Sequence, residues 1–140
     1  MKKQKRVIDQ EEALALMEKA VLERGEKWCY PHLLVGECAY FMDDEETFDS
    51  VFVNYGLKPN GPSCLVGLAL SYVGLTKEII SYHNTEGVTS INDAIEGNDD
   101  IDWVLGADAI KVFYKAQEYQ DDGAKWGDVL RIVKEEAQDS

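Results

Sequence analysis

The chain has 140 residues, 45% of them hydrophobic and 29% charged, and its 27 acidic and 14 basic residues give a formal net charge of −13. This length and composition predict one ordinary globular domain that can bury its own core. The negative charge disfavours binding to nucleic acid or to an anionic membrane surface. No apolar run approaches the roughly 20 residues that span a bilayer.

The cysteines and the N-terminal segment indicate the compartment. Three cysteines, an odd number, favour reduced thiols over a disulfide framework. The first residues lack the apolar run of an export signal. We therefore expect a cytoplasmic protein. Residues 1–8, which are rich in lysine, are expected to form a flexible basic tail, and residues 9–138 a single globular domain.

The first helix is predicted to begin at Asp9. Its side chain can accept from free amides of the first turn, and Glu12 follows three residues later, as in a capping box. Gly25 is expected to end the helix. Apolar residues at helical spacing predict its buried stripe: Leu14, Met17, Val21 and Leu22.

A β-rich region is predicted next. Three runs, 28–30, 37–42 and 48–53, are rich in aromatic and β-branched residues, which pack well on a pleated surface. The acidic stretch between the last two runs has the composition of a hairpin loop. We therefore expect a small antiparallel sheet.

The stretch from Ser63 to Val73 is predicted to be a buried central helix, with Ser63 as its cap and Gly74 as its end. It is apolar on nearly every face, and such a helix has to be surrounded by the rest of its domain. Gly67 in its middle costs about 1 kcal/mol of helix stability relative to alanine. We therefore expect another element to approach closely at Gly67.

The C-terminal half is predicted to be helical, and the fold class to be α+β, dominated by helices, with the antiparallel element packed on the central helix. Trp103 is placed in a turn after a polar loop, and Trp126 at the corner of a final helical hairpin. Caps, glycines and apolar spacing predict four helices: 76–82, 90–97, 107–120 and 125–138.

Four residues form the best candidate metal site: Cys29, His32, Cys38 and Cys64. Thiolates and an imidazole suit zinc, and four ligands would close a structural site. Their spacing is not that of a known zinc finger, and buried cysteines also pack as small apolar residues, which is the interpretation we favour. Because the sequence contains no phosphate-binding glycine loop, HExxH or GxSxG motif, we expect neither an enzyme nor a cofactor.

Two acidic clusters are candidate partner-binding surfaces. The first comprises Asp43, Asp44, Glu45 and Glu46, and the second Asp99, Asp100 and Asp102. They could face a basic groove on a partner protein. The alternative is a solvated surface that maintains solubility.

Three stretches carry a resemblance to known proteins: Cys38-x-Tyr40, Pro62-Ser63-Cys64-Leu65-Val66-Gly67-x-Ala69-Leu70-x-x-x-Gly74 and Gln117-x-x-Gln120-Asp121-x-Gly123-x-x-Trp126-Gly127. From about residue 28 to residue 133 the chain resembles small uncharacterised proteins encoded by bacteriophages and prophages of Gram-positive bacteria. The resemblance implies no activity and no catalytic residue. Residues 43–54 form an insertion relative to those proteins.

Three functions are therefore expected in order of preference. The first is a non-enzymatic acidic interaction protein that binds a host or phage macromolecule. A host or phage protein is the expected partner, because small acidic phage proteins without enzymatic motifs often act in this way. The second is a small-ligand or zinc protein organised around Cys29, His32, Cys38 and Cys64. The third is a virion or assembly component.

Overall fold

Helices dominate the computed structural model, which describes residues 5–30, 39–80, 83–84 and 86–138. These residues form a small single domain with seven helices and a two-stranded sheet. In chain order the elements are β1 (Arg6–Ile8), α1 (Gln10–Arg24), the 3₁₀ helix η1 (Ser50–Tyr55), α3 (Leu65–Ser71), α4 (Lys77–Ile80), α5 (Val88–Glu96), β2 (Trp103–Leu105), α6 (Ala107–Asp121) and α7 (Trp126–Gln138).

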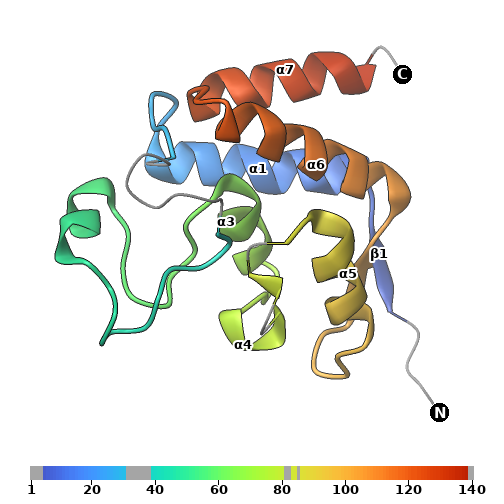
Figure 1. Ribbon diagram of the computed structural model, residues 1–140. Coiled ribbons are helices and arrows are strands. Elements are labelled where there is room, and N and C mark those ends of the chain that lie inside the picture. The colour runs from blue at the N-terminus through green and yellow to red at the C-terminus, as the bar shows by residue number, and fades with distance from the viewer. Residues whose placement is uncertain (1–4, 31–38, 81–82, 85, 139–140) are drawn as a thin grey trace.

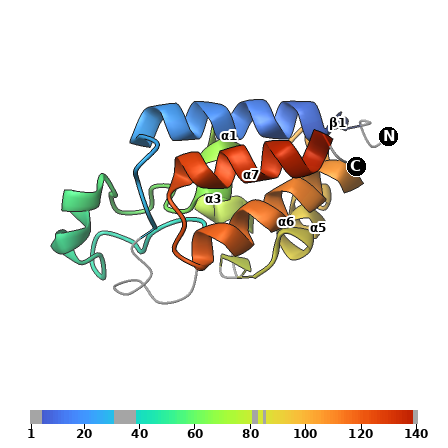
Figure 2. The same ribbon diagram turned by 90° about the horizontal axis from the view of Figure 1, so that it is seen from above.

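Three long helices form one layer. Helices α1, α6 and α7 contact one another, and α3 contacts α1 and α6 from below. Viewed from above, α7 runs between α1 and α6 and antiparallel to both (Figure 2). Helices α4 and α5 lie on the far side of α3 from α7 (Figure 1). The core therefore sits between the long helices and the short ones, around α3.

Helix α3 confirms the prediction of a buried central helix. Each of its residues from Leu65 to Leu70 is buried. It is shorter than the predicted 63–73, and its cap is Cys64, whose Sγ accepts from the Gly67 amide (3.3 Å), rather than Ser63. The Ser63 side chain instead donates its hydroxyl to the Ala39 carbonyl.

A close approach at Gly67 was predicted and is confirmed. A Cβ at this position would lie 2.3 Å from the carbonyl oxygen of Tyr40, closer than any van der Waals contact. That oxygen also accepts from the Ser63 amide (2.9 Å), so it is held in place above the helix. The missing side chain lets the backbone around Tyr40 pack directly on α3.

The prediction of an antiparallel sheet is wrong. The sheet is parallel and pairs β1 with β2, so that Ile8 lies opposite Leu105; Trp103 lies in β2 rather than in a turn. Among the described residues, antiparallel pairing is limited to a single bridge between Phe41 and Pro62. Residues 50–55 form η1 instead of a strand. Strand propensity reports how a side chain fits a half-buried pleated surface, and η1 has no such surface beside it.

The predicted flexible tail is too long. Residues 6–8 form β1, and Ile8 is completely buried. Lys5 also contacts the domain, because its Nζ donates to the carbonyls of Ile95 and Asn98 (2.6 Å each) at the end of α5. The folded domain therefore begins before Asp9, and residues 1–4 lie outside the described residues.

The helix predictions otherwise hold, with shifted ends. Asp9 caps α1 by accepting from the Glu12 amide (2.9 Å), and Gly25 follows its last turn. Met17 and Val21 are buried as expected, but Leu22 is 77% exposed. Helix α5 begins two residues before the predicted Ser90, and α6 and α7 match their predicted ranges to within one residue. Helix α4 is described from Lys77 to Ile80, and residues 81–82 of its predicted range lie outside the described residues.

One buried side chain joins three helices. Gln120, near the end of α6, is completely buried. Its Oε1 accepts from the Leu65 amide at the start of α3 (2.8 Å) and from the Trp126 indole at the start of α7 (3.1 Å). The placement of Trp126 at the corner of the helical hairpin is confirmed, and Gln120 is the partner that its indole N–H requires.

Gly67→Ala is expected to destabilise the protein by about 1–3 kcal/mol, because the added methyl group overlaps the Tyr40 carbonyl. This loss outweighs the gain of about 1 kcal/mol in helix propensity. Equilibrium urea unfolding measures both effects together. The matched control is Gly97→Ala at the end of α5, where φ is −81° and a Cβ meets only ordinary contacts; it should be neutral or stabilise by up to about 1 kcal/mol. A Gly67→Ala protein as stable as the control would contradict the packing described here.

Candidate functional site

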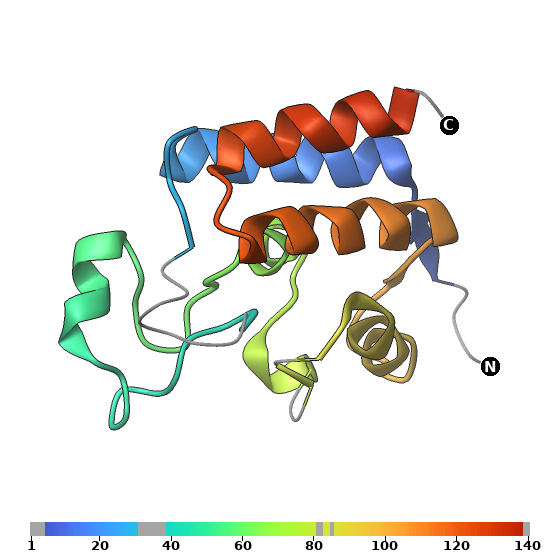
Figure 3. The same ribbon diagram turned by 45° about the horizontal axis from the view of Figure 1, so that its top comes forward.

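Residues 43–56, here called the projecting segment, extend away from the helical layers (Figures 1 and 3). The second half of this segment is η1, which has six residues, none of them buried. Runs of 3₁₀ helix longer than three or four residues are uncommon. Val51, Val53 and Tyr55 are 38%, 61% and 39% exposed. The segment therefore presents apolar side chains to solvent at a point that lies away from the helical layers.

The base of the projecting segment is fixed to the domain. The Trp28 indole donates to the Tyr55 carbonyl (2.9 Å), and the neighbouring Leu57 is buried. On the other side the Asn60 amide donates to the Asp43 carbonyl (2.8 Å). Within the segment, Asp49 caps η1 by accepting from the Val51 amide (3.0 Å). The exposed helix is thus held at both ends.

The first acidic cluster lies on this segment. Asp43, Asp44, Glu45 and Glu46 are all exposed. Asp44 accepts from both the hydroxyl and the amide of Thr47 (3.0 and 3.2 Å). The hydroxyl and then the amide of Thr47 lower the pKa of Asp44 below its ordinary value of 3.8, because both favour the ionised form. Asp44 therefore carries its charge across the physiological range.

The second acidic cluster lies elsewhere. Asp99, Asp100 and Asp102 are exposed in the loop that follows α5, which lies on the other side of the molecule from the projecting segment (Figure 1). This loop has a structural role: the Arg6 amide donates to the Asp102 carbonyl (2.8 Å), and Lys5 binds the Asn98 carbonyl. The two clusters do not form one surface. Each has a lysine bound beside it: Lys77 donates to the Met42 carbonyl next to the first cluster (2.9 Å), and Lys5 binds the loop of the second.

The described cysteines do not form a shared site. Cys29 is exposed, with its Sγ 3.8 Å from the carbonyl oxygens of Lys27 and Gly123, whereas Cys64 is completely buried and caps its own helix. The part of the chain that the structure describes contains no group of three potential metal ligands. His32 and Cys38 lie outside the described residues, so the proposed zinc set of four is not tested.

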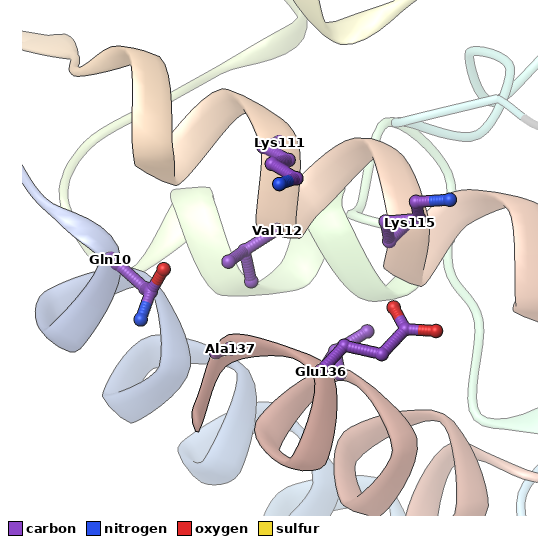
Figure 4. Close-up of a pocket in the computed structure, with 7 residues that line it drawn as sticks. Gln10, Lys111, Val112, Lys115, Glu136 and Ala137 are labelled. Carbon is purple, nitrogen blue, oxygen red and sulfur yellow. The ribbon is translucent and has the colours of Figure 1, made fainter. Parts of the chain in front are cut away.

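The described surface includes a small and a larger hollow. The smaller, of about 30 Å³, lies between α1, α6 and α7 and is lined by Gln10, Lys111, Lys115 and Glu136 among others (Figure 4). It has room for little more than a water molecule. The larger, of about 370 Å³, lies beside the base of the projecting segment and contains Arg24 and Lys58. Its volume is within the range of small-molecule sites.

The comparisons with known proteins identify no relative: no protein-family model, curated protein or solved structure matches the chain. The resemblance to phage-encoded proteins therefore stays an expectation.

Within the described residues, no helix combines the length and the apolar character that crossing a bilayer requires.

The sequence names the first acidic cluster as a candidate surface, which stays a prediction, but it does not reveal two features of the site. The apolar and aromatic composition of residues 50–53 predicts a strand, whereas these residues form part of the exposed helix η1. The larger hollow joins residues of α1, α3 and the connection between η1 and α3, which no local spacing brings together. A lone arginine at the end of an amphipathic helix gives no signal of such a site.

The Asp44 turn should respond to pH in a defined direction. Because the folded pKa lies below 3.8, the turn is fully stabilised above that pH and loses its stabilisation as the pH falls through the lowered value. Following the Asp44 carboxyl carbon by NMR should give a midpoint below 3.8. Thr47→Val, which removes the hydroxyl donor, should raise that midpoint towards 3.8. An Asp44 midpoint that is the same in both proteins would contradict the hydrogen-bonded turn.

Proposed function

We propose that this protein is a non-enzymatic acidic interaction module that binds a partner protein through the projecting segment. The observation that supports this most strongly is η1, whose Val51, Val53 and Tyr55 side chains are exposed although their composition suits a buried surface. Apolar side chains gathered on an exposed surface are typical of sites that bind another molecule. Tyrosine in particular is enriched among residues that dominate binding energies.

The chemistry of the segment specifies the kind of partner. Exposed apolar side chains are flanked in sequence by Asp43–Glu46 and Asp49, without a basic residue between Asp43 and Gly56. The complementary surface is an apolar patch bordered by lysine or arginine side chains. Rim charges of this kind act chiefly on the association rate and its salt dependence, while the apolar centre slows dissociation. By its resemblance to phage-encoded proteins, we expect the partner to be a host or phage protein.

The second acidic cluster is a weaker candidate for the same function. Its loop connects α5 to β2 and is bound by Lys5 and Arg6, so its conformation is explained by the fold. Asp99, Asp100 and Asp102 also lack neighbouring exposed apolar side chains within the loop, because Ile101 and Trp103 are buried. A cluster of carboxylates alone is well explained as a solvated surface.

Position-dependent crosslinking tests this proposal. A photo-crosslinking amino acid at Val53 should form one covalent adduct in host lysate, whereas the same amino acid at Tyr114, which is 52% exposed on α6, should not. The adduct identifies the partner for purification. Binding of the purified partner should then weaken at least about tenfold in Val53→Asp, because a charge enters the apolar centre.

Charge variants separate the two acidic clusters. Replacing Asp43, Asp44, Glu45 and Glu46 by their amides should slow association and reduce its salt dependence. The control variant, with Asp99, Asp100 and Asp102 replaced by asparagine, should bind as the unmodified protein does. Equal crosslinking from Val53 and from Tyr114 would contradict the proposal. A Val53 adduct between two copies of the chain would instead favour the assembly function.

A further inference from the structure

The larger hollow has an unusual composition for so acidic a protein. It is a cleft of about 370 Å³ between the end of α1, the second half of α3 and the connection from η1 to α3. Arg24 and Lys58 supply two positive charges to its lining, and Leu68 and Pro62 supply apolar surface. Ligand sites of this size combine apolar walls with a few polar groups in this manner.

Arg24 forms no direct ion pair with a carboxylate of the described residues. Its guanidinium donates to the carbonyls of Pro62 and Ser63, which are neutral acceptors. The guanidinium carbon lies 4.8 Å from the ring centre of Trp28 and 5.2 Å from that of Trp126. Since a guanidinium has five N–H donors, two carbonyl bonds leave donors available.

Two lysines add to this positive charge. The ammonium group of Lys58 has no ion pair in the described part of the chain, and Lys58 is exposed at the cleft. The ammonium group of Lys19 lies 4.3 Å from the ring centre of Tyr72, another residue of the lining. Burial lowers the pKa of Arg24, and the nearby Glu23 carboxylate, which lines the same cleft, partly opposes this shift.

We propose that this cleft binds a small molecule that carries a phosphate or carboxylate group. The oxyanion is held between Arg24 and Lys58, and the remainder of the ligand lies against Leu68 and Pro62. An arginine is well suited to oxyanions because its planar fork donates parallel hydrogen bonds. This site is separate from the exposed surface of η1 and does not depend on the partner proposed above.

One acidic side chain opposes such a ligand. Glu23 lines the same cleft and accepts from the Tyr72 hydroxyl (3.0 Å). Burial and this contact raise the pKa of Tyr72 to about 12, so the hydroxyl keeps its proton at neutral pH. Because the Glu23 carboxylate repels an anion, its neutral analogue provides a variant that should bind more tightly than the natural chain.

Tryptophan fluorescence can report binding directly, because Trp28 and Trp126 lie beside Arg24. The full chain is titrated at low ionic strength with inorganic phosphate and, separately, with citrate. The phosphate titration shows whether the cleft accepts a phosphate group, and the citrate titration shows whether it accepts a carboxylate. At least one of the two should give a saturable change in fluorescence. Lys58→Gln should weaken that binding about threefold and Glu23→Gln should strengthen it about threefold. The surface control Lys125→Gln should leave it unchanged.

Arg24→Lys should weaken binding about tenfold, because the planar fork is lost while the charge remains. A variant of Arg24 could also disturb the fold, since the residue binds Pro62 and Ser63, but the opposite effects of Lys58→Gln and Glu23→Gln do not depend on it. Absence of a saturable change with both anions would overturn the proposal. So would equal effects of Lys58→Gln and Lys125→Gln, which would indicate general charge screening.

Discussion

The fold depends on the two hydrogen bonds that the Gln120 side chain accepts. One comes from the first turn of α3 and the other from the Trp126 indole at the start of α7. Both donors are buried, and a buried donor that loses its acceptor costs about 1–3 kcal/mol. Because α3 lies below the long helices and Gln120 lies at the end of one of them, this single amide sets the position of the central helix. The same region holds Arg24 against Trp28 and Trp126, so the cleft depends on it as well.

The projecting segment contrasts with this core. Its fixed points are hydrogen bonds that the domain donates to main-chain carbonyls near its two ends, and none of the six residues of η1 is buried. Exposing valine and tyrosine side chains in this way brings no folding benefit, because folding is driven by apolar burial. This exposed surface is the basis of the partner protein proposed above. The domain thus combines a core that holds its helices rigidly with a segment that is available for contact.

Much of the helical fold could be predicted from the sequence, because it depends on local signals. The Asp9 cap, the close approach at Gly67 and the corner at Trp126 each follow from residues within one or two helical turns. The sheet could not be predicted, since β1 and β2 are separated by most of the chain and each has only three residues. The run at 48–53 was misassigned because strand propensity reflects burial against a partner strand. Of the candidate site, the exposure of the first acidic cluster follows from its composition, and its role in binding stays a prediction. Arg24, Lys58 and Tyr72 meet only in the tertiary structure.

The core and the projecting segment are expected to unfold independently of each other, and native-state hydrogen exchange of the unmodified chain and of Gln120→Leu tests this most directly. The substitution leaves the Leu65 and Trp126 donors without an acceptor, which we expect to cost about 2 kcal/mol or more. Amides of α3 and α6 should then exchange about 30-fold faster, while amides of η1 should exchange at an unchanged rate. An equal acceleration in η1 would contradict the claim, because it would show that the segment unfolds only with the core.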